Sequence, residues 1–289
     1  MIEIIFQNKE DAKNFHKALQ LHLSSAADKN NLLVEDRHIV KVSLNLLSKE
    51  YLEAMKKAFY EFIIFTKRDD WFRTILVQHY YYHDLEEQQQ ILDIIHSILE
   101  GKREELEVFL KDSNLEKTLM DALGQMFQEN ISFSFDSFVK FRLRPFLDLL
   151  EKYAQVSIDE YKMEQEYQVF VQTLREFLAT RPSKIDHLHL LIDEGITFFD
   201  EQYYEIKRGE LARMIDRKLL FNHPVYVDSV TIAPLLSIAP ASIFLYTQEP
   251  DQPLIRTIRN IFEERVRIKP VSVLYNHRRF LRMTAEENF

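Results

Sequence analysis

The residues best suited to hydrolytic chemistry lie beyond residue 190. Glu205 and Lys207 stand two positions apart at the end of a predicted hairpin, with Asp193 and Asp200 upstream. Residues two apart on a strand share a face, and carboxylates beside an ammonium group can hold Mg²⁺ and polarise a water molecule. The same spacing also occurs on an exposed hairpin whose charges discourage edge pairing. The pattern therefore leaves two interpretations, a metal-dependent nuclease strand and a charged surface hairpin.

A second set of candidate ligands precedes residue 85. His79 and His83 are four apart on a predicted helix, which would place both imidazoles on one face, and Asp84 follows directly. Two nitrogen ligands and a carboxylate could hold zinc or iron. Residues 80–82 are all tyrosine, so the glutamate base of the metalloprotease pattern is missing. A partly buried histidine and aromatic cluster is the alternative, and we expect no cofactor.

The C-terminal end is locally basic. Between Arg256 and Arg282 there are eight basic and two acidic residues, interleaved with aromatic rings. Cations neutralise phosphates and aromatic rings stack on bases, so this segment is the candidate nucleic-acid interface. The residues that would make the contact are Arg265, Arg267, Lys269, Arg278 and Arg279.

The charge of the whole chain opposes that interpretation. The net charge is -9, with 22 basic and 31 acidic residues in 1–180 but 15 of each in 181–289. The basic end could therefore dock on the acidic part of the same chain instead of on nucleic acid. Clustering of the basic residues on one face of the protein would favour nucleic-acid binding.

Composition excludes several other classes of function. The 289 residues include no cysteine and only four glycines, so disulfides, thiolate chemistry and glycine-rich phosphate loops are absent. The longest uncharged run, 229–248, contains two prolines, and we interpret it as a short buried helix followed by a buried strand. No membrane span is expected, and the N-terminus lacks the basic start of a secretory signal. We therefore expect a cytoplasmic protein.

The elements that must position these residues begin with a small β-α-β-β unit over 1–48. Apolar periodicity then predicts helices over 49–180, including one over about 103–128. The aromatic residues of 59–82, including Phe65, are interpreted as core, with some left for a protein interface. Pro145 favours a helix start, which predicts a long spine helix over about 146–179 that Pro182 ends.

Beyond the spine, the pattern of 181–289 predicts a mixed α/β unit. Alternation over 188–192 indicates a strand with His187 and His189 on one side, and a turn at 193–195 leads into a hairpin. Helices are predicted over about 210–220 and 253–264, with 266–273 extended. The chain is thus expected to be an α+β protein, mainly helical, with regions 1–48, 49–180 and 181–289.

Four stretches of the chain carry a family resemblance. Residues 137–145 (SFVKFRLRP), 158–167 (IDEYKMEQEY), 170–177 (FVQTLREF) and 184–189 (KIDHLH) resemble the YtxC-like family. The resemblance implies a sporulation-associated cytoplasmic protein of endospore-forming Firmicutes. It brings no catalytic or binding residues with it.

These observations favour a non-enzymatic role. The leading hypothesis is a cytoplasmic, sporulation-associated protein that acts by binding protein partners, whose identity and number no motif specifies. The alternative is a nucleic-acid-binding protein, or a metal-dependent nuclease, that uses the C-terminal unit.

Overall fold

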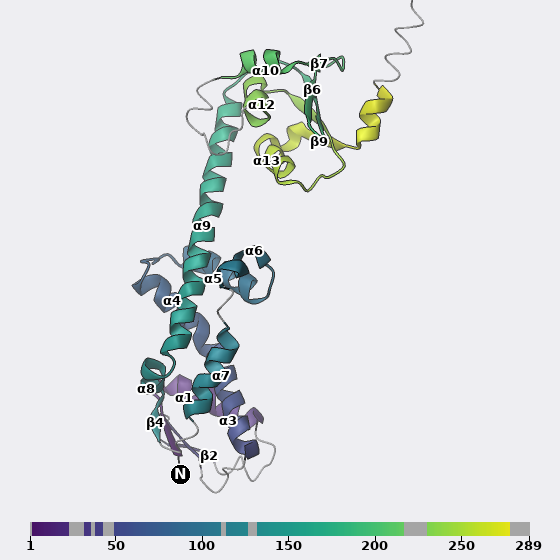
Figure 1. The fold of residues 1–289 in the computed structure, drawn as a ribbon. Helices are drawn as coiled ribbons and strands as arrows, with labels where there is room; N and C mark the ends of the chain where they lie inside the picture. The colour runs from purple at the N-terminus through teal and green to yellow at the C-terminus, as the bar shows by residue number, and fades with distance from the viewer. Residues whose placement is uncertain are drawn as a thin grey trace, which may run out of the picture. The chain divides into compact units, whose positions relative to one another are not determined.

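The computed structural model describes residues 2–22, 32–35, 38–42, 49–110, 114–126, 132–216 and 230–277. The chain forms two compact units, Met1–Met163 and Glu164–Phe289. Both contain a small sheet, and helices make up most of the described residues (Figure 1). The expected α+β, mainly helical fold is confirmed.

The first unit combines a four-stranded sheet with helices. Its strands are β1 (Ile2–Ile5), β2 (Leu32–Glu35), β3 (Ile39–Val42) and β4 (Phe133–Ser134). Its helical elements are α1 (Lys9–His22), α3 (Lys49–Phe62), the π-helical turn η2 (Ile63–Lys67), α4 (Arg68–Gln78), α5 (Leu85–Leu99), α6 (Glu104–Glu107), the 3₁₀ turn η3 (Val108–Leu110), α7 (Leu115–Met126), α8 (Phe135–Phe141) and the start of α9 (Arg144–Ala179).

The sheet of the first unit has the strand order β2-β3-β1-β4. β1, β2 and β3 are antiparallel, with Ile4 opposite Val40, so the predicted β-α-β-β arrangement is confirmed. β4 adds a fourth, parallel strand from far along the chain, which local pattern did not predict. The backbone N–H of Glu3 donates to Ser132 Oγ at 2.9 Å and fixes this junction.

The prediction of one continuous helix over about 103–128 was wrong. Among the described residues, the segment forms α6 and η3, and a separate helix, α7, begins at Leu115. The reason is a cap, because the Asn114 side chain accepts a hydrogen bond from the backbone N–H of Lys117 at 2.7 Å. Asparagine is among the strongest N-cap residues, so a new helix begins there.

The long spine helix is confirmed as α9, which has 36 residues and would span about 54 Å at 1.5 Å per residue. Pro145 lies in its first turn, where a missing N–H costs no helical hydrogen bond. Phe146, Leu150 and Ile158 are buried in the core of the first unit, and Phe170 and Leu174 in that of the second.

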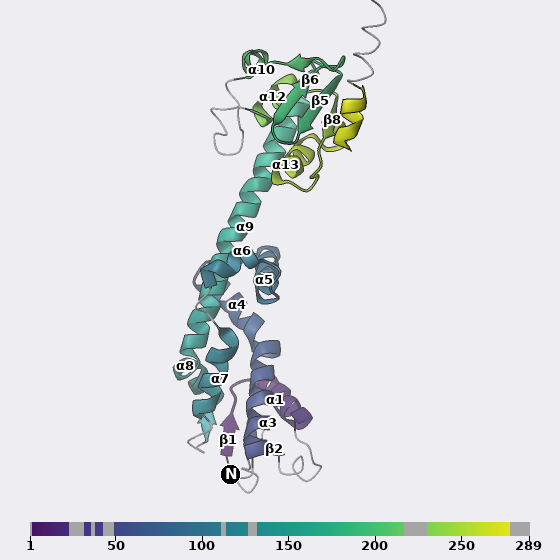
Figure 2. The same ribbon diagram turned by 45° about the vertical axis from the view of Figure 1, so that its right-hand side comes forward.

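The second unit is built on a five-stranded sheet of order β7-β6-β5-β8-β9 (Figure 2). β5, β8 and β9 are parallel, and β6 and β7 extend one edge as antiparallel hairpins. The strands are β5 (His187–Ile192), β6 (Ile196–Phe199), β7 (Glu205–Ile206), β8 (Ser242–Tyr246) and β9 (Val266–Lys269). The helical elements, besides the end of α9, are α10 (Arg208–Met214), α12 (Ile232–Ile238), α13 (Pro253–Phe262) and the 3₁₀ turn η4 (Glu263–Arg265).

The uncharged run over 229–248 behaves as predicted where it is described. Every residue of α12 is buried, and β8 follows it through Pro240. No described helix is both long enough and apolar enough to cross a bilayer.

The segment expected to be extended over 266–273 is a strand only as far as Lys269. Residues 271–277 are helical, because Pro270 has no N–H to continue the ladder and its fixed φ suits the start of a helix. Val271 and Leu274 of this short helix are buried with Phe199 and Tyr246 in a small cluster on one face of the sheet.

Candidate functional site

The four candidate nuclease residues lie along an exposed hairpin. Asp193 follows β5, whereas Asp200 follows β6, so the four residues of β6 separate them by roughly 13 Å at 3.3 Å per residue. Asp200 Oδ1 accepts hydrogen bonds from the backbone N–H groups of Gln202 and Tyr204, both at 2.9 Å, which closes the turn to β7.

Glu205 and Lys207 have local structural partners. Glu205 is exposed opposite Phe199 in the β6–β7 ladder. Lys207 is the N-cap residue of α10, and its backbone N–H donates to Glu210 Oε2 at 3.2 Å. Asp200 and Glu205 thus share one end of the hairpin, and Asp193 lies at the other.

The histidine pair does not lie on one helix face, and that expectation was wrong. α4 ends at Gln78, and Tyr81 has a φ of 62°, which a helix does not allow. His79 Nδ1 lies 2.9 Å from Glu151 Oε1 on α9. Asp84 is the N-cap of α5, where its carboxylate accepts from the N–H groups of Glu86 and Glu87.

Within the described ranges, no group of three or more histidine, aspartate or glutamate side chains is arranged to hold a metal ion. His83 lies exposed in the loop between α4 and α5. The structure therefore does not bring His79, His83 and Asp84 together as a set of metal ligands.

The described basic candidates lie at the β9 edge of the second sheet. Lys269 Nζ is 4.1 Å from the centroid of the Phe244 ring, and the Arg267 guanidinium carbon is 5.9 Å from it. Arg265 Nη1 donates to the Pro240 carbonyl at 3.4 Å, which ties it to the fold. Arg278 and Arg279 lie outside the described residues.

A stacked ring cluster covers the same sheet face as these cations. His189 of β5 is only 4% exposed and lies between Tyr203 and Phe244, with ring centroids 4.0 Å and 5.1 Å away. Its Nδ1 shares a 3.0 Å hydrogen bond with Tyr246 Oη. The sequence indicated a polar strand face here, but only His187 is exposed.

Burial sets the protonation states in this cluster. Desolvation, helped by the nearby charge of Lys269, lowers the pKa of His189 to about 4, so the ring is neutral near pH 7. Burial, with Tyr203 nearby, raises the pKa of the Tyr246 phenol well above its usual range. The cluster holds neutral groups in a packed layer, so it offers no ready general base.

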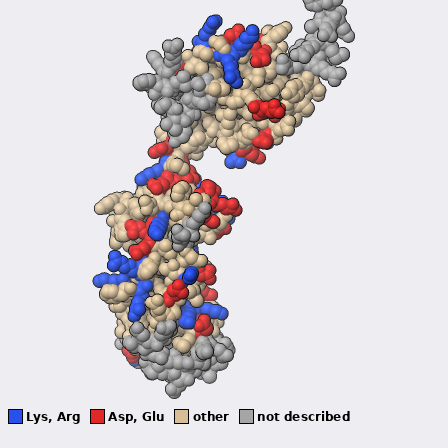
Figure 3. Space-filling view, viewed as in Figure 1, with Lys and Arg blue, Asp and Glu red and all other residues tan. Residues whose placement is uncertain are grey.

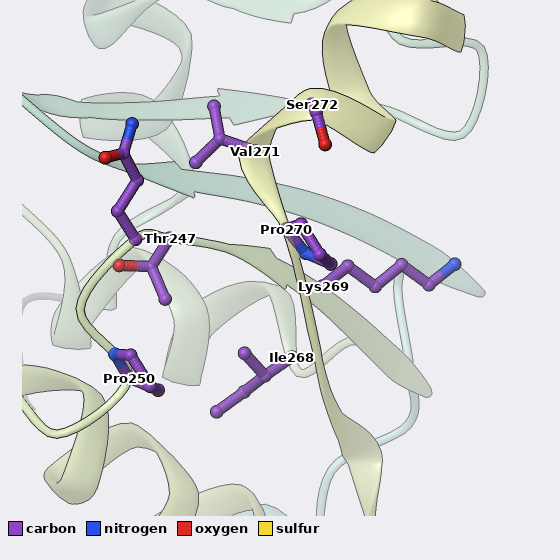
Figure 4. A pocket seen from close by; sticks show the side chains of 8 residues that line it. Thr247, Pro250, Ile268, Lys269, Pro270, Val271 and Ser272 are labelled. Atoms are coloured by element: carbon purple, nitrogen blue, oxygen red, sulfur yellow. The ribbon is translucent and has the colours of Figure 1, made fainter.

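A hollow of about 500 Å³ opens at the carboxyl ends of β8 and β9 (Figure 4). Thr247 and Pro250 line it from the loop after β8, and Ile268 from β9. Among the described residues that line it, Lys269 is the charged one, and in Figure 4 its side chain points away from Ile268. The Thr247 hydroxyl accepts from the Glu249 backbone N–H at 3.0 Å. Apolar side chains dominate its walls, and the described lining residues include no group of charges that could orient a ligand.

Further recesses lie among the helices of the first unit. Two hollows, of about 370 Å³ and about 500 Å³, are both lined by Leu99 at the end of α5. We call their apolar lining the Leu99 surface, which consists of Ile64, Phe65, Ile98, Leu99, Val108 and Leu110.

Two local features create the Leu99 surface. In the π turn between α3 and α4, the N–H of Arg68 bonds to the Ile63 carbonyl, and Phe65 is left 80% exposed. At the other side, Gly101 adopts a φ of 69° directly after α5, a left-handed conformation that glycine accepts readily. The chain then turns into α6 and η3, which present Val108 to solvent.

Carboxylates surround these apolar residues. Asp69 and Glu100 line the smaller hollow, and Glu104 and Glu107 line the larger. Figure 3 shows acidic side chains gathered over the α6 region of this face. The Tyr153 phenol also lines the larger hollow, and burial together with the charge of Glu107 raises its pKa.

The aromatic pattern of 59–82 does not identify this surface, because it favours a core position for most of these rings and does not show which of them are left for an interface. A signal for this surface is present in the sequence of α6, where Glu104, Glu105 and Glu107 flank a single buried residue, Leu106. Val108 and Phe109, both exposed, follow at once. Exposed apolar residues beside an acidic turn fit an interaction surface when they join a larger apolar patch.

These features define a class of protein: two α+β units, with recessed apolar surface on the helical one and no metal-binding cluster among the described residues. The chain belongs to the YtxC-like family, whose model matches residues 53–267. It is 34% identical to "Uncharacterized protein YtxC" of Bacillus subtilis strain 168 over 273 residues, which cover 94% of this chain and 95% of that one. No solved structure matches the chain. The family resemblance noted in the sequence is therefore confirmed.

Proposed function

We propose that this protein acts in the cytoplasm during endospore formation as a non-enzymatic component that binds a partner protein through the Leu99 surface. The observation that carries the proposal is the pair of hollows on either side of Leu99, next to the strongly exposed Phe65. Recessed apolar surface edged by polar residues is typical of protein interaction sites. Membership of the YtxC-like family supports the cellular context.

The side chains around these hollows favour binding over catalysis. His96 Nε2 is engaged at 3.1 Å by Asp69 Oδ2, and Glu100 is paired with Lys102 at 2.5 Å. A nucleophile needs an adjacent base that is itself oriented by a third group. The lining residues supply apolar contact area and fixed charges instead.

A matched pair of variants tests the proposal. Tagged protein carrying Phe65→Ser should lose a partner that wild type retains from sporulating cells, because truncating a central aromatic anchor removes much of the binding energy. Phe141→Ser is the control, since Phe141 is a similarly exposed phenylalanine of the same unit, on α8. Spore yield in cells complemented with each variant should follow partner retention. Equal retention and equal spore yield for both variants would reject the proposal.

Nucleic-acid binding by the second unit is the second candidate function. It is favoured by the half-buried Phe244, which has Arg267 and Lys269 over its ring and the exposed His187 5.7 Å from it. One ring flanked by two cations can stack on a base and neutralise a phosphate. If this candidate function is correct, Arg278 and Arg279 would add basic residues to the surface around Phe244.

Retention on single-stranded DNA and RNA tests this second candidate. Salt-sensitive retention that is weakened by Arg267→Glu, and also by charge reversal at Arg278 and Arg279, would support it. Arg256→Glu is the matched control, because Arg256 is an exposed arginine of the same unit that belongs to α13 and not to β9. Absence of retention at low salt would eliminate it. The nuclease alternative additionally requires Mg²⁺-dependent cleavage that Glu205→Ala or Lys207→Ala abolishes.

A further inference from the structure

Building on the partner-binding role proposed above, we infer that the Leu99 surface accepts a basic amphipathic helix of the partner protein. The occupant is defined by two properties of the surface, its divided apolar lining and the sign of the charge around it. Each property is independent of the family to which the chain belongs.

The apolar lining is divided between two hollows, which suits the regularly spaced apolar side chains of a helix. Leu99 lines both hollows, with Ile64 and Phe65 in the smaller one and Val108 and Leu110 in the larger. A helix presents large apolar side chains at i, i+3, i+4 and i+7 along one face, so successive anchors can enter separate recesses. A flat sheet edge, which would recruit an extended peptide, is not part of this surface.

The charged lining residues are mostly acidic. Among the described lining residues, Asp69, Glu100, Glu104 and Glu107 are opposed by one cation, Arg68, whose Nε donates to Asp69 Oδ1 at 3.4 Å. The ammonium charge of Lys102 offsets part of this negative charge, and its hydrogen bond to Glu100 lowers the pKa of that carboxyl. Arg103, the next basic residue in the chain, forms an ion pair with Glu160 of α9, with 2.8 Å between Nη1 and Oε1.

The carboxylates of α6 are the ones that could pair with basic residues of a partner. Glu104, Glu105 and Glu107 are exposed and have no ion pair within the described residues. Charge complementarity of this kind selects partners and speeds their encounter. A helix whose polar face carries lysine or arginine would meet these carboxylates while its apolar face covers Leu99.

Peptide binding to the full chain tests the inference directly. The probe is a fluorescently labelled peptide of about 18 residues, long enough for a marginal helix, with leucines on one face and lysines on the other. Glutamate replaces lysine in a second peptide, and a third has the basic composition in scrambled order. Anisotropy should show that the basic amphipathic peptide binds and the other two do not.

Variants locate the binding site. Phe65→Ser should weaken binding of the basic peptide about tenfold, as expected for a central anchor. The double variant Glu104→Lys/Glu107→Lys should weaken it about fivefold at low salt and less at high salt, because screening already reduces the attraction there. Phe141→Ser and Asp121→Lys, at exposed positions on α8 and α7, are the matched controls and should leave binding unchanged.

The outcomes separate this inference from the proposed function. If the acidic peptide binds as well as the basic one, or if Asp121→Lys weakens binding as much as the Glu104/Glu107 pair, the basic-helix inference is rejected. A cellular partner that is still lost on Phe65→Ser would keep the proposed function in that case. If Phe65→Ser affects neither the peptide nor the cellular partner, both are rejected. Unchanged Trp71 fluorescence in each variant confirms that the first unit is folded.

Discussion

In the first unit, phenylalanine rings from several parts of the chain meet in one core, whereas the second unit fills its main core with leucine and isoleucine. Phe6, Phe15, Phe59, Phe62 and Phe135 contact one another with ring centroids 4.1 to 6.4 Å apart. In the second unit, Leu188, Leu190, Ile243 and Leu245 cover the inner face of the sheet. Its stacked rings lie on the outer face, around His189.

This difference shows that aromatic residues serve two purposes in one chain. Rings with partners on every side are core, and their positions follow from long-range contacts. Phe65, with solvent on one side, and Phe244, beside two cations, are the rings on which the two proposed binding roles rest. Aromatic content alone does not separate these cases, but the number of packed neighbours does.

The largest expected effect comes from emptying the ring core. Phe59→Ala should lower the free energy of unfolding of the first unit by about 3–5 kcal/mol, since it deletes a fully buried ring whose centroid is 4.1 Å from that of Phe15. Trp71, the chain's single tryptophan, contacts Phe146 in the same unit and reports this unfolding by fluorescence during urea titration.

Leu245→Ala is the comparison variant in the second unit and should cost about 2–5 kcal/mol there. Circular dichroism should detect this loss while the Trp71 transition stays in place. A Trp71 transition that shifts as much with Leu245→Ala as with Phe59→Ala would mean that the two units unfold as one, and the contrast between their cores would lose its thermodynamic meaning.

An intermediate effect is expected from pH. His189 has a folded pKa of about 4, below its ordinary value of 6.5, so the unfolded chain binds the proton more readily. Stability therefore rises with pH between about 4 and 6.5, and the second unit should lose about 2 kcal/mol on going from pH 7 to pH 4.5. Urea titrations followed by circular dichroism at both pH values measure this.

His189→Phe should flatten the pH dependence of the second unit, because it keeps a ring in the stack and removes the titrating group. His187→Gln, on the same strand face, should keep most of the slope, because burial rather than neighbouring charge is the main cause of the shift. A slope that survives His189→Phe would show that another group carries the pH dependence.

The smallest expected effect concerns Asp84, where capping and metal binding give opposite predictions. Asp84→Ala should destabilise the first unit by about 1 kcal/mol through loss of the α5 cap, and Asp84→Ser should restore most of that. Added Zn²⁺ should leave the Trp71 unfolding midpoint of wild type unchanged. A midpoint raised by Zn²⁺ and lost on His79→Ala would instead support the metal site.

Much of the fold could be predicted because its signals are local. Pro145 and Pro182 bracket α9, alternation identified β5, and Gly101 marked the end of α5. Local rules failed where a distant contact or a subtle backbone change decided the outcome. β4 pairs with β1 across about 130 residues of chain, and α4 ends before His79 although apolar spacing continues.

The candidate sites were less predictable than the elements that carry them. Asp193, Asp200, Glu205 and Lys207 lie near one hairpin, but the length of β6 keeps Asp193 apart from Asp200 and Glu205. The aromatic content of 59–82 favours a core position for Phe65, yet the π turn leaves its side chain exposed. The Leu99 surface needs residues from η2, α5 and η3 together, which no spacing in the sequence reveals.

The sequence by itself determined the α+β class, the spine helix, the family and the classes of chemistry that the composition excludes. These depend on residue content and on patterns within a few turns of chain. Only the tertiary structure decided which side chains converge. It turned the His79, His83 and Asp84 set into a helix end, a loop and a cap, and it buried His189 among rings while exposing Phe65 beside a carboxylate rim. The physical reason is that burial and convergence depend on contacts between elements distant in the chain, whereas periodicity reports only which face of each element is apolar.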